Sequence, residues 1–262
     1  VMKLTIKKTT EVENEVEISD EMNDDSYTQN GASVYDGIYG ILTGVANTAS
    51  NEELEMKANN RKYFGQGVQT VLNFNFNTGN ISHKIDVGAR VHQDQVDRFQ
   101  SKDLYKMENG TMIITQVGKP GTESNRIESA DALAMYLQYK LKWNNLTITP
   151  GVRNENITMT KKDFGKKDVD RTGVNLKEFS NKVSVVLPGI GVDYKISSAI
   201  NIFAGAHKGF SPSGSTEGAM PENSINYEAG TRFMKKSLNG QLVVFYNDYK
   251  NLLGSDLAAA GG

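Results

Sequence analysis

Charged and histidine side chains recur at alternate positions in several segments of this 262-residue chain. Arg90, His92 and Asp94 form one such set, and Arg153 and Glu155 form another. Alternate residues of an extended strand share a face, so each set projects from one side of a strand. A guanidinium binds a carboxylate through two parallel hydrogen bonds, and a charged wall attracts anions over a long range. The full set of candidates with this parity is Arg90, His92, Asp94, Arg153, Glu155, His207, Glu228 and Arg232.

The segment around Arg90 shows the alternation most clearly. Its apolar face carries Ile81, His83, Ile85, Val87, Ala89 and Val91, and its polar face carries Ser82, Lys84, Asp86, Gly88, Arg90 and His92. Two-faced strands of this kind, joined by short turns at one end and long loops at the other, are typical of an outer-membrane β-barrel. The apolar face of such a strand contacts lipid, and the polar face lines the lumen.

The alternation predicts nine strands, separated in turn by short and long connections. The short ones are tight turns at Thr78-Gly79-Asn80, Asn144-Asn145 and Ser197-Ser198 and near Leu238-Asn239-Gly240, which contain residue types that favour turns. The long ones cover about residues 10–62, 99–126, 161–179 and 211–223. Single-chain bacterial barrels generally have an even number of strands, and closure pairs the first with the last. We therefore expect an all-β fold, an antiparallel transmembrane β-barrel segment that forms an open curved sheet and whose two terminal strands need partners outside this chain.

Composition excludes several other classes of protein. No apolar stretch approaches the roughly 20 residues of a membrane helix, and the net charge of −2 offers no basic face for nucleic acid. Hydrophobic residues make up only 38% of the chain, which a barrel allows because half of each strand faces a polar lumen. Val1–Thr9 contains no signal peptide, and we expect the chain to be an internal piece of a longer protein.

The lengths of the connections predict an orientation. In outer-membrane barrels the short turns are periplasmic and the long loops are extracellular, and aromatic residues mark both interfaces. This places Phe76, Tyr139 and Trp143 near the periplasmic rim, and Tyr63, Phe64 and Phe210 near the outer one. The alternative is that these aromatic residues form the core of a soluble sandwich.

Two interpretations of the polar face stay open. Residues nearer the outer mouth are candidates for contact with an anionic chelate, and these are Arg90, His92 and His207. Residues farther from the mouth favour a structural ladder of ion pairs, since barrel interiors are polar in any case; these are Arg153, Glu155, Glu228 and Arg232.

Neither catalysis nor metal binding is predicted. The three histidines are scattered, with no His-x-x-x-His or Gly-x-Ser-x-Gly element nearby, and His92 with Asp94 is the one acid–histidine pair on a strand. The acidic segment from Glu11 to Asp25 offers oxygen ligands for a hard cation. It lacks the spacing of a calcium loop, so a solvated surface loop is favoured. We expect no enzyme activity, no metal site and no cofactor.

Four short motifs resemble one family. Pro221–Arg232 resembles the Pro-Glu-x-Ser-x-x-Tyr-Glu-x-Gly-x-Arg stretch in the barrels of TonB-dependent outer-membrane receptors. Lys208–Pro212, Phe245–Leu253 and Pro150–Glu155 resemble neighbouring strands of the same barrels, although Ser213 stands where relatives often carry a second proline. The resemblance covers about residues 60–262, and the segment Gly254–Gly261 is similar to the ferric-dicitrate type.

The resemblance implies a 22-stranded barrel that is occluded by an N-terminal plug. Residues 1–262 then form a partial receptor β-barrel domain that lacks the plug and the C-terminal strands, with residues 10–62 as a long extracellular loop. The whole receptor would bind a ferric chelate, either ferric citrate or a siderophore, and import it across the bacterial outer membrane with energy from the TonB complex. Its partners would be the chelate, the TonB complex through the plug, and outer-membrane lipid. Plug contact is a further possible role for the ladder residues. The alternative function is a surface nutrient-binding or adhesion barrel without transport.

Overall fold

The alternating segments pair edge to edge into one antiparallel sheet. The computed structural model describes residues 2–20, 39–235 and 238–252. Strands in these residues are β1 (Met2–Asp20), β2 (Leu54–Thr78), β3 (Ile81–Glu108), β4 (Thr111–Gln116), β5 (Ser124–Trp143), β6 (Leu146–Asp163), β7 (Lys177–Lys195), β8 (Ile200–Ser211), β9 (Glu222–Lys235) and β10 (Leu238–Lys250). The all-β prediction is confirmed.

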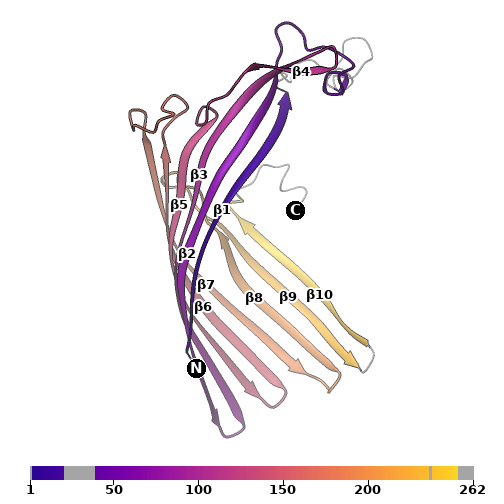
Figure 1. Ribbon diagram of the computed structural model, residues 1–262. Helices are drawn as coiled ribbons and strands as arrows, with labels where there is room; N and C mark the ends of the chain where they lie inside the picture. The colour runs from indigo at the N-terminus through magenta and orange to yellow at the C-terminus, as the bar shows by residue number, and fades with distance from the viewer. Residues whose placement is uncertain (1, 21–38, 236–237, 253–262) are drawn as a thin grey trace.

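The sheet curls into an open trough, with β1 and β10 at its two edges (Figure 1). Nine strands follow one another in chain order, and β4 pairs only with the outward end of β3. Tight turns lie at one end of the trough, where Gly79 and Asn144 adopt positive φ angles of 55° and 50°. Glycine and asparagine tolerate this region better than other residues. Long connections lie at the opposite end, as the alternation predicted.

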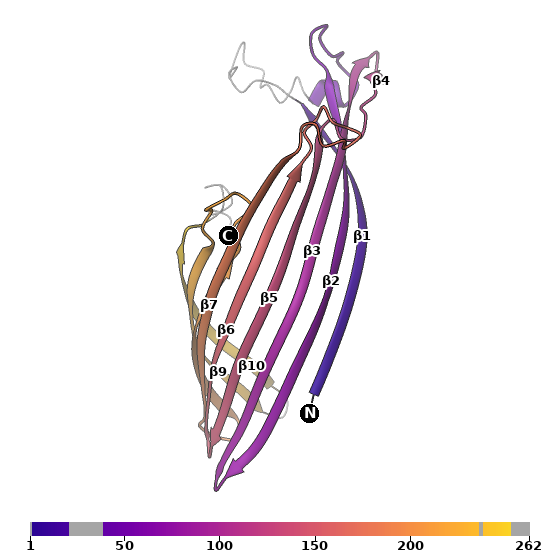
Figure 2. The ribbon, with the colours of Figure 1, turned by 90° about the vertical axis from the view of Figure 1, so that its left-hand side faces the viewer.

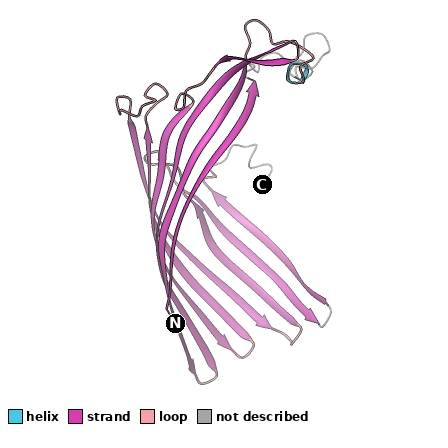
Figure 3. Cartoon of the chain, in the orientation of Figure 1, coloured by secondary structure: helices cyan, strands magenta, loops and turns pink. Residues whose placement is uncertain are grey.

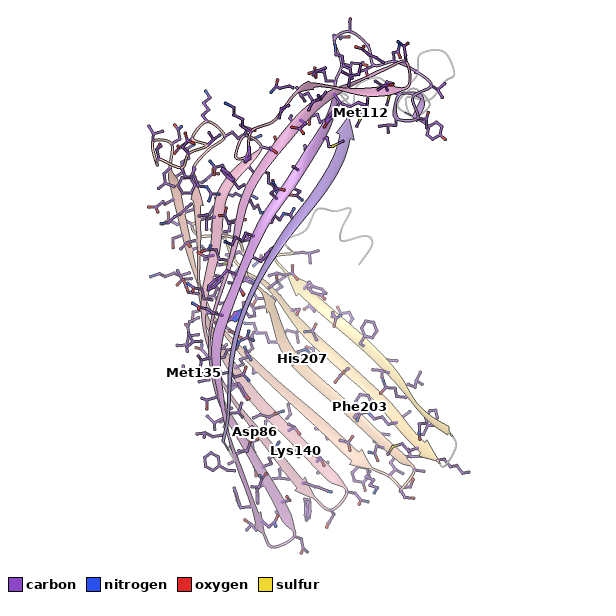
Figure 4. All side chains as sticks on the ribbon, viewed as in Figure 1. Asp86, Met112, Met135, Lys140, Phe203 and His207 are labelled. Atoms are coloured by element: carbon purple, nitrogen blue, oxygen red, sulfur yellow. The ribbon has the colours of Figure 1, made fainter. Side chains whose placement is uncertain are left out.

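The convex face of the trough is apolar. Cross-strand register aligns Leu72, Val87, Leu137 and Val152 in one row, and all four are exposed. Similar rows continue across the sheet as far as Leu242 and Val244 of β10. Seen from this side, β1 to β3 and β5 to β7 lie next to one another as a tilted wall, with β4 beyond its outward end (Figure 2). Met135 lies on this convex face, whereas Phe203 and His207 lie on the concave face, inside the trough (Figure 4).

Aromatic rings cluster on the convex face near the tight turns. Phe76 stacks on His83 with ring centres 4.6 Å apart, and His83 stacks on Tyr139 at 5.9 Å. Nδ1 of His83 also lies 2.6 Å from the Tyr139 hydroxyl. Trp143 is exposed beside the turn that follows it. These positions agree with the predicted aromatic rim at the short-turn end.

The predicted outer aromatic rim is wrong in part. Tyr63 lines the hollow of the concave face, and Phe210 packs on a buried cluster of Met159, Val183 and Val185 on that same face. Tyr63 and Phe64 are neighbours in a strand and cannot share a face. Phe210 turns inward because β8 pairs with β7 only as far as His207, so its outward end is free to lean over the trough.

Strands extend farther outward than the alternation predicted. β1 continues to Asp20, which is paired with Leu54, so the first long connection spans residues 21–53 and not 10–62. β3 continues to Glu108 and folds back through β4, a tenth strand within the expected loop of 99–126. A membrane crossing needs about 9–11 strand residues, whereas β3 has 28. A strand that continues beyond a membrane would have water on both faces, and pairing there would not require an apolar alternation.

Within residues 2–20, 39–235 and 238–252, helix is limited to one short turn at residues 39–42, near the outward end (Figure 3). In the described residues, no helix is long and apolar enough to cross a membrane.

The predicted turn at Leu238-Asn239-Gly240 is also corrected. Leu238 pairs with Lys235, so all three residues belong to β10, and residues 236–237 lie outside the described residues. Gly240 is opposite Phe233, and a Cβ atom there would lie 2.4 Å from the Phe233 ring. Glycine in a strand can mark a close approach as well as a turn. The other three predicted turns are confirmed.

An arginine in place of Val87 tests the assignment of the convex face. In the full-length protein that contains this chain, folded in lipid vesicles, we expect Val87→Arg to lower the free energy of unfolding by about 2–4 kcal/mol, because the charge lies at mid-bilayer. Gln93→Arg, on the same face of β3 but above the apolar band, is the matched control, with an expected effect of about 1 kcal/mol or less. Urea titration measures both. Equal effects would mean that the convex face does not contact lipid.

Candidate functional site

A hydrogen-bonded chain of three side chains runs along the concave face of β3. Nη2 of Arg90 lies 3.0 Å from Nδ1 of His92, and Nε2 of His92 lies 2.7 Å from Oδ2 of Asp94. Because arginine can only donate, Nδ1 must accept, and the ring proton is therefore assigned to Nε2, which donates to Asp94. The structure thus brings together three residues that the alternation had placed on one face.

The hydrogen-bonded side chains of Arg90, His92 and Asp94 border a cavity of about 830 Å³. Its lining includes small residues of β2 and β5, namely Gly65, Gly67 and Ala130, and the larger side chains of Tyr63 and Met159. Gly214 and Ser215, from the connection between β8 and β9, complete the lining. Ligand sites are commonly about 300–1,000 Å³ and combine apolar walls with a few placed polar groups. The cavity has both properties.

The β8–β9 connection is fastened onto the concave face by Asn181. The buried amide of Asn181 on β7 donates to Oγ of Ser213 at 3.1 Å and to the carbonyl oxygens of Gly214 at 3.2 Å and Ala219 at 3.0 Å. Ser213, only 1% exposed, donates to the Ala219 carbonyl at 2.8 Å. Sequence reasoning gave Ser213 no role. Its hydroxyl stabilises a connection that lines the cavity.

Arg153 and Glu155 form an ion pair on β6. Glu155 is 8% exposed, and its register partner Ala134 on β5 is in turn paired with Arg90. The pair therefore lies two strands from Arg90 on the same face. Burial of the carboxylate beside its own arginine is consistent with the structural interpretation of this pair.

The remaining predicted residues lie on β8 and β9, away from the Arg90 chain. Nη1 of Arg232 lies 3.3 Å from Oδ2 of Asp193 on β7, and its guanidinium lies 4.0 Å above the Phe203 ring. His207 and Glu228 are exposed on the same face. The structure thus divides the predicted set into three groups that share one face but do not touch.

An arginine row was missed by the sequence analysis. Register pairs Arg61 of β2 with Arg98 of β3, and Arg98 with Arg126 of β5. All three have the concave parity. They lie at the edges of the predicted long loops, where no alternating pattern assigned residues to a face. Their alignment also depends on the register between strands, which composition does not encode.

Comparison with known proteins gives a family. A family model described as TonB dependent receptor-like, beta-barrel, matches residues 14–262. The chain belongs to the TonB-dependent receptor β-barrel family. Members of this family are outer-membrane receptors and transporters rather than enzymes.

Solved receptor barrels share this fold. The ferric citrate transporter FecA in its unliganded form has a TM-score of 0.60 at 19% identity, over 80% of this chain and 31% of that one. The ferric-catecholate import receptor Fiu from E. coli has a TM-score of 0.64 at 15% identity, over 95% of this chain and 38% of that one.

A curated relative is similar in sequence. The metal-pseudopaline receptor CntO of Pseudomonas aeruginosa is 29% identical over 205 residues, which cover 70% of this chain and 27% of CntO. This chain of the receptor barrel family therefore spans about a quarter of that relative's length.

The outward end of this receptor barrel is clamped by Arg171, from the connection between β6 and β7. Its guanidinium bonds both carboxylate oxygens of Asp97, at 2.9 and 2.5 Å, and bonds Oδ1 of Asn125 at 2.8 Å. It also lies 4.7 Å from the Phe99 ring centre and 5.2 Å from that of Phe164. One side chain therefore joins this connection to the outward ends of β3 and β5.

Asp168 organises the same connection. Burial alone would raise the pKa of its carboxyl group, but hydrogen bonds from the Thr172 and Gly173 amides and the Thr172 hydroxyl outweigh burial and lower that pKa below its ordinary value. The ionised form is thus favoured in the folded loop.

Replacement of Asn181 tests the fastening of the β8–β9 connection. Asn181→Ala removes three hydrogen bonds, so we expect amide exchange in residues 213–219 to accelerate by about tenfold or more while the strands stay protected. Hydrogen exchange with mass spectrometry on the full-length receptor measures this. Lys182→Ala, a neighbour on the convex face, should leave that exchange unchanged. Equal exchange in Asn181→Ala and the parent would contradict the fastening.

Acid should loosen the Asp168 loop. Because the folded pKa is lowered, the stability that Asp168 contributes is complete above its ordinary value of 3.8 and is lost as pH falls through the lower folded value. We expect exchange protection of the Thr172 and Gly173 amides, corrected for intrinsic rates, to be constant at neutral pH and to fall towards pH 2. Asp168→Asn should abolish this dependence. A variant with the same acid profile as the parent would show that another group is responsible.

Proposed function

We propose that this chain is part of the wall of an outer-membrane receptor that binds an anionic metal chelate and imports it with energy from the TonB complex. The observation that carries the proposal is the cavity bordered by Arg90, His92 and Asp94 on the concave face of a receptor-family barrel. We expect this site to bind the chelate and to take part in its gated passage, without catalysing a reaction.

The geometry suits a chelate whose surface carries oxygen acceptors. Arg90 is exposed, so those of its donors not engaged by His92 can reach a ligand. Asp94, 63% exposed on its side chain, balances part of the local charge and orients the imidazole. Carboxylate, catecholate or hydroxamate oxygens would accept from Arg90, and the walls formed by Tyr63 and Met159 would contact the carbon skeleton.

The names of similar proteins support this class of ligand. They are a ferric citrate transporter, a ferric-catecholate import receptor and a metal-pseudopaline receptor, and all of these names refer to metal chelates. The choice of ferric citrate or a siderophore for this chain, its outer-membrane location and its dependence on TonB are parts of our proposal. Arg153, Glu155, Glu228 and Arg232 would then stabilise the wall or contact a plug, and His207 would contact ligand farther along the trough.

Replacement of Arg90 tests the proposal. In cells that carry the full-length receptor as their one route for iron chelates, we expect Arg90→Ala to lower the affinity for radiolabelled ferric citrate, or for a ferric catecholate, by about tenfold, because a charged hydrogen-bond donor is lost. Gln93→Ala, on the opposite face of β3, is the matched control. Uptake is measured with and without TonB.

The outcomes separate the candidate functions. Chelate binding without TonB-dependent uptake would favour the surface nutrient-binding alternative. Normal binding and uptake by Arg90→Ala would remove the Arg90 cavity as the ligand site.

A further inference from the structure

The hairpin formed by the outward end of β3 and by β4 has one edge without a strand partner. β3 pairs with β5 over residues 81–100 and with β4 over residues 104–108. β4 lies off the path that joins β1 to β10, so closure of a barrel through those two strands cannot cover its second edge. Within the described part of the chain, β3 is the only strand that pairs with Thr111–Gln116. The N–H and C=O groups of the second edge are therefore left for water or for another strand.

This hairpin is a regular element that is fastened at its base. Its turn residues Asn109 and Gly110 have φ angles of 49° and 75°, and a two-residue hairpin turn of the commonest type needs positive φ at both positions. The connection before β2 anchors the strand opposite β4. The Met107 amide donates to Oγ1 of Thr48 and the Asn109 amide donates to Oδ1 of Asn47, both at 2.7 Å. The free edge is thus held in the extended form that strand addition requires.

The free edge is apolar and uncharged. Met112, Ile113 and Ile114 are 39%, 43% and 43% exposed, and they occupy both faces of β4 because neighbouring residues of a strand alternate. Met112 lies at the outward extremity of the molecule (Figure 4). Thr111–Gln116 contains no charged residue and no proline, which are the residues that usually protect an edge strand from pairing. An exposed edge of this composition favours the addition of another strand.

β4 is complementary to a second copy of itself. Antiparallel pairing about a two-fold axis at Ile113 sets this residue opposite its own copy. In the same register Met112 lies opposite the partner's Ile114, and Thr111 lies opposite the partner's Thr115. Apolar pairs and threonine pairs in directly opposite positions stabilise a sheet, whereas like charges there destabilise it. Because β4 has no charge, this register sets no like charges against each other.

We propose that β4 pairs with β4 of a second copy of the receptor, so that the two outward hairpins form one continuous antiparallel sheet. The interface is isologous, since the same edge serves both copies. It lies at the end of the trough that carries the long connections, and it does not depend on which ligand the cavity holds.

Disulfide formation in cells that carry the full-length receptor tests the register. We expect Ile113→Cys to form a disulfide-linked dimer, because directly opposite Cα atoms lie about 4.5–5.5 Å apart, within the span of a disulfide. Thr111→Cys is the matched control, since its own copy lies four residues along the partner strand, about 13 Å away. It should crosslink only when it is co-expressed with Thr115→Cys. The parent receptor, oxidised in parallel, controls for any cysteine outside these 262 residues, which contain none.

Sedimentation of the purified full-length receptor in detergent micelles tests the association itself. We expect the parent to form a dimer, and we expect Ile113→Lys to weaken that self-association by about tenfold or more, because it sets two like charges directly opposite each other. Val117→Lys, one residue beyond β4 and 71% exposed in the parent, is the matched control and should leave the dimer intact.

Each contrary outcome overturns the proposal. A monomeric parent would do so, and so would equal crosslinking of Ile113→Cys and Thr111→Cys. A dimer that persists unchanged in Ile113→Lys would mean that another surface joins the two copies. Crosslinks from Ile113→Cys to a different surface protein, without a self-linked dimer, would mean that a foreign strand occupies the edge of β4.

Discussion

The backbone hydrogen-bond ladder is the constraint on which the rest of this structure depends. A chain in contact with lipid cannot leave its N–H and C=O groups to water, so each must pair within the sheet. Antiparallel pairing joins each strand to its neighbours from β1 to β10, which are the two edges of the sheet. Once the ladder is set, each side chain has a defined face, and the band of exposed apolar residues lies on the convex side. The polar residues then converge on the concave side, where a ligand site can form.

Convergence on the concave side brings distant residues together. Arg232 reaches Asp193 across the intervening strand β8, and Asn181 reaches the β8–β9 connection some 30 residues later in the chain. A flat sheet would hold these groups apart. Curvature therefore has two effects, since it closes the wall around a lumen and also builds contacts that stabilise the lining of the cavity.

Beyond the apolar band, polar interactions stabilise the connections between strands. Arg171 lies between two aromatic rings and bonds Asp97, and Asp168 caps the turn that carries Arg171. Strands β2 and β3 persist in this region without an apolar face. Their regularity holds Arg61 and Arg98 in register beyond the cavity.

Alternation determined much of this protein in advance. It assigned the two faces, located three of the four tight turns, and placed Arg90, His92 and Asp94 on one side, because the face of a residue follows from its own strand. The short motifs indicated the family. Tertiary structure alone decided the outward reach of β1 and β3, the inward turn of Phe210, the fastening of Ser213 by Asn181 and the alignment of Arg61, Arg98 and Arg126. The reason is physical: parity is local to one strand, whereas register and curvature depend on the pairing of whole strands.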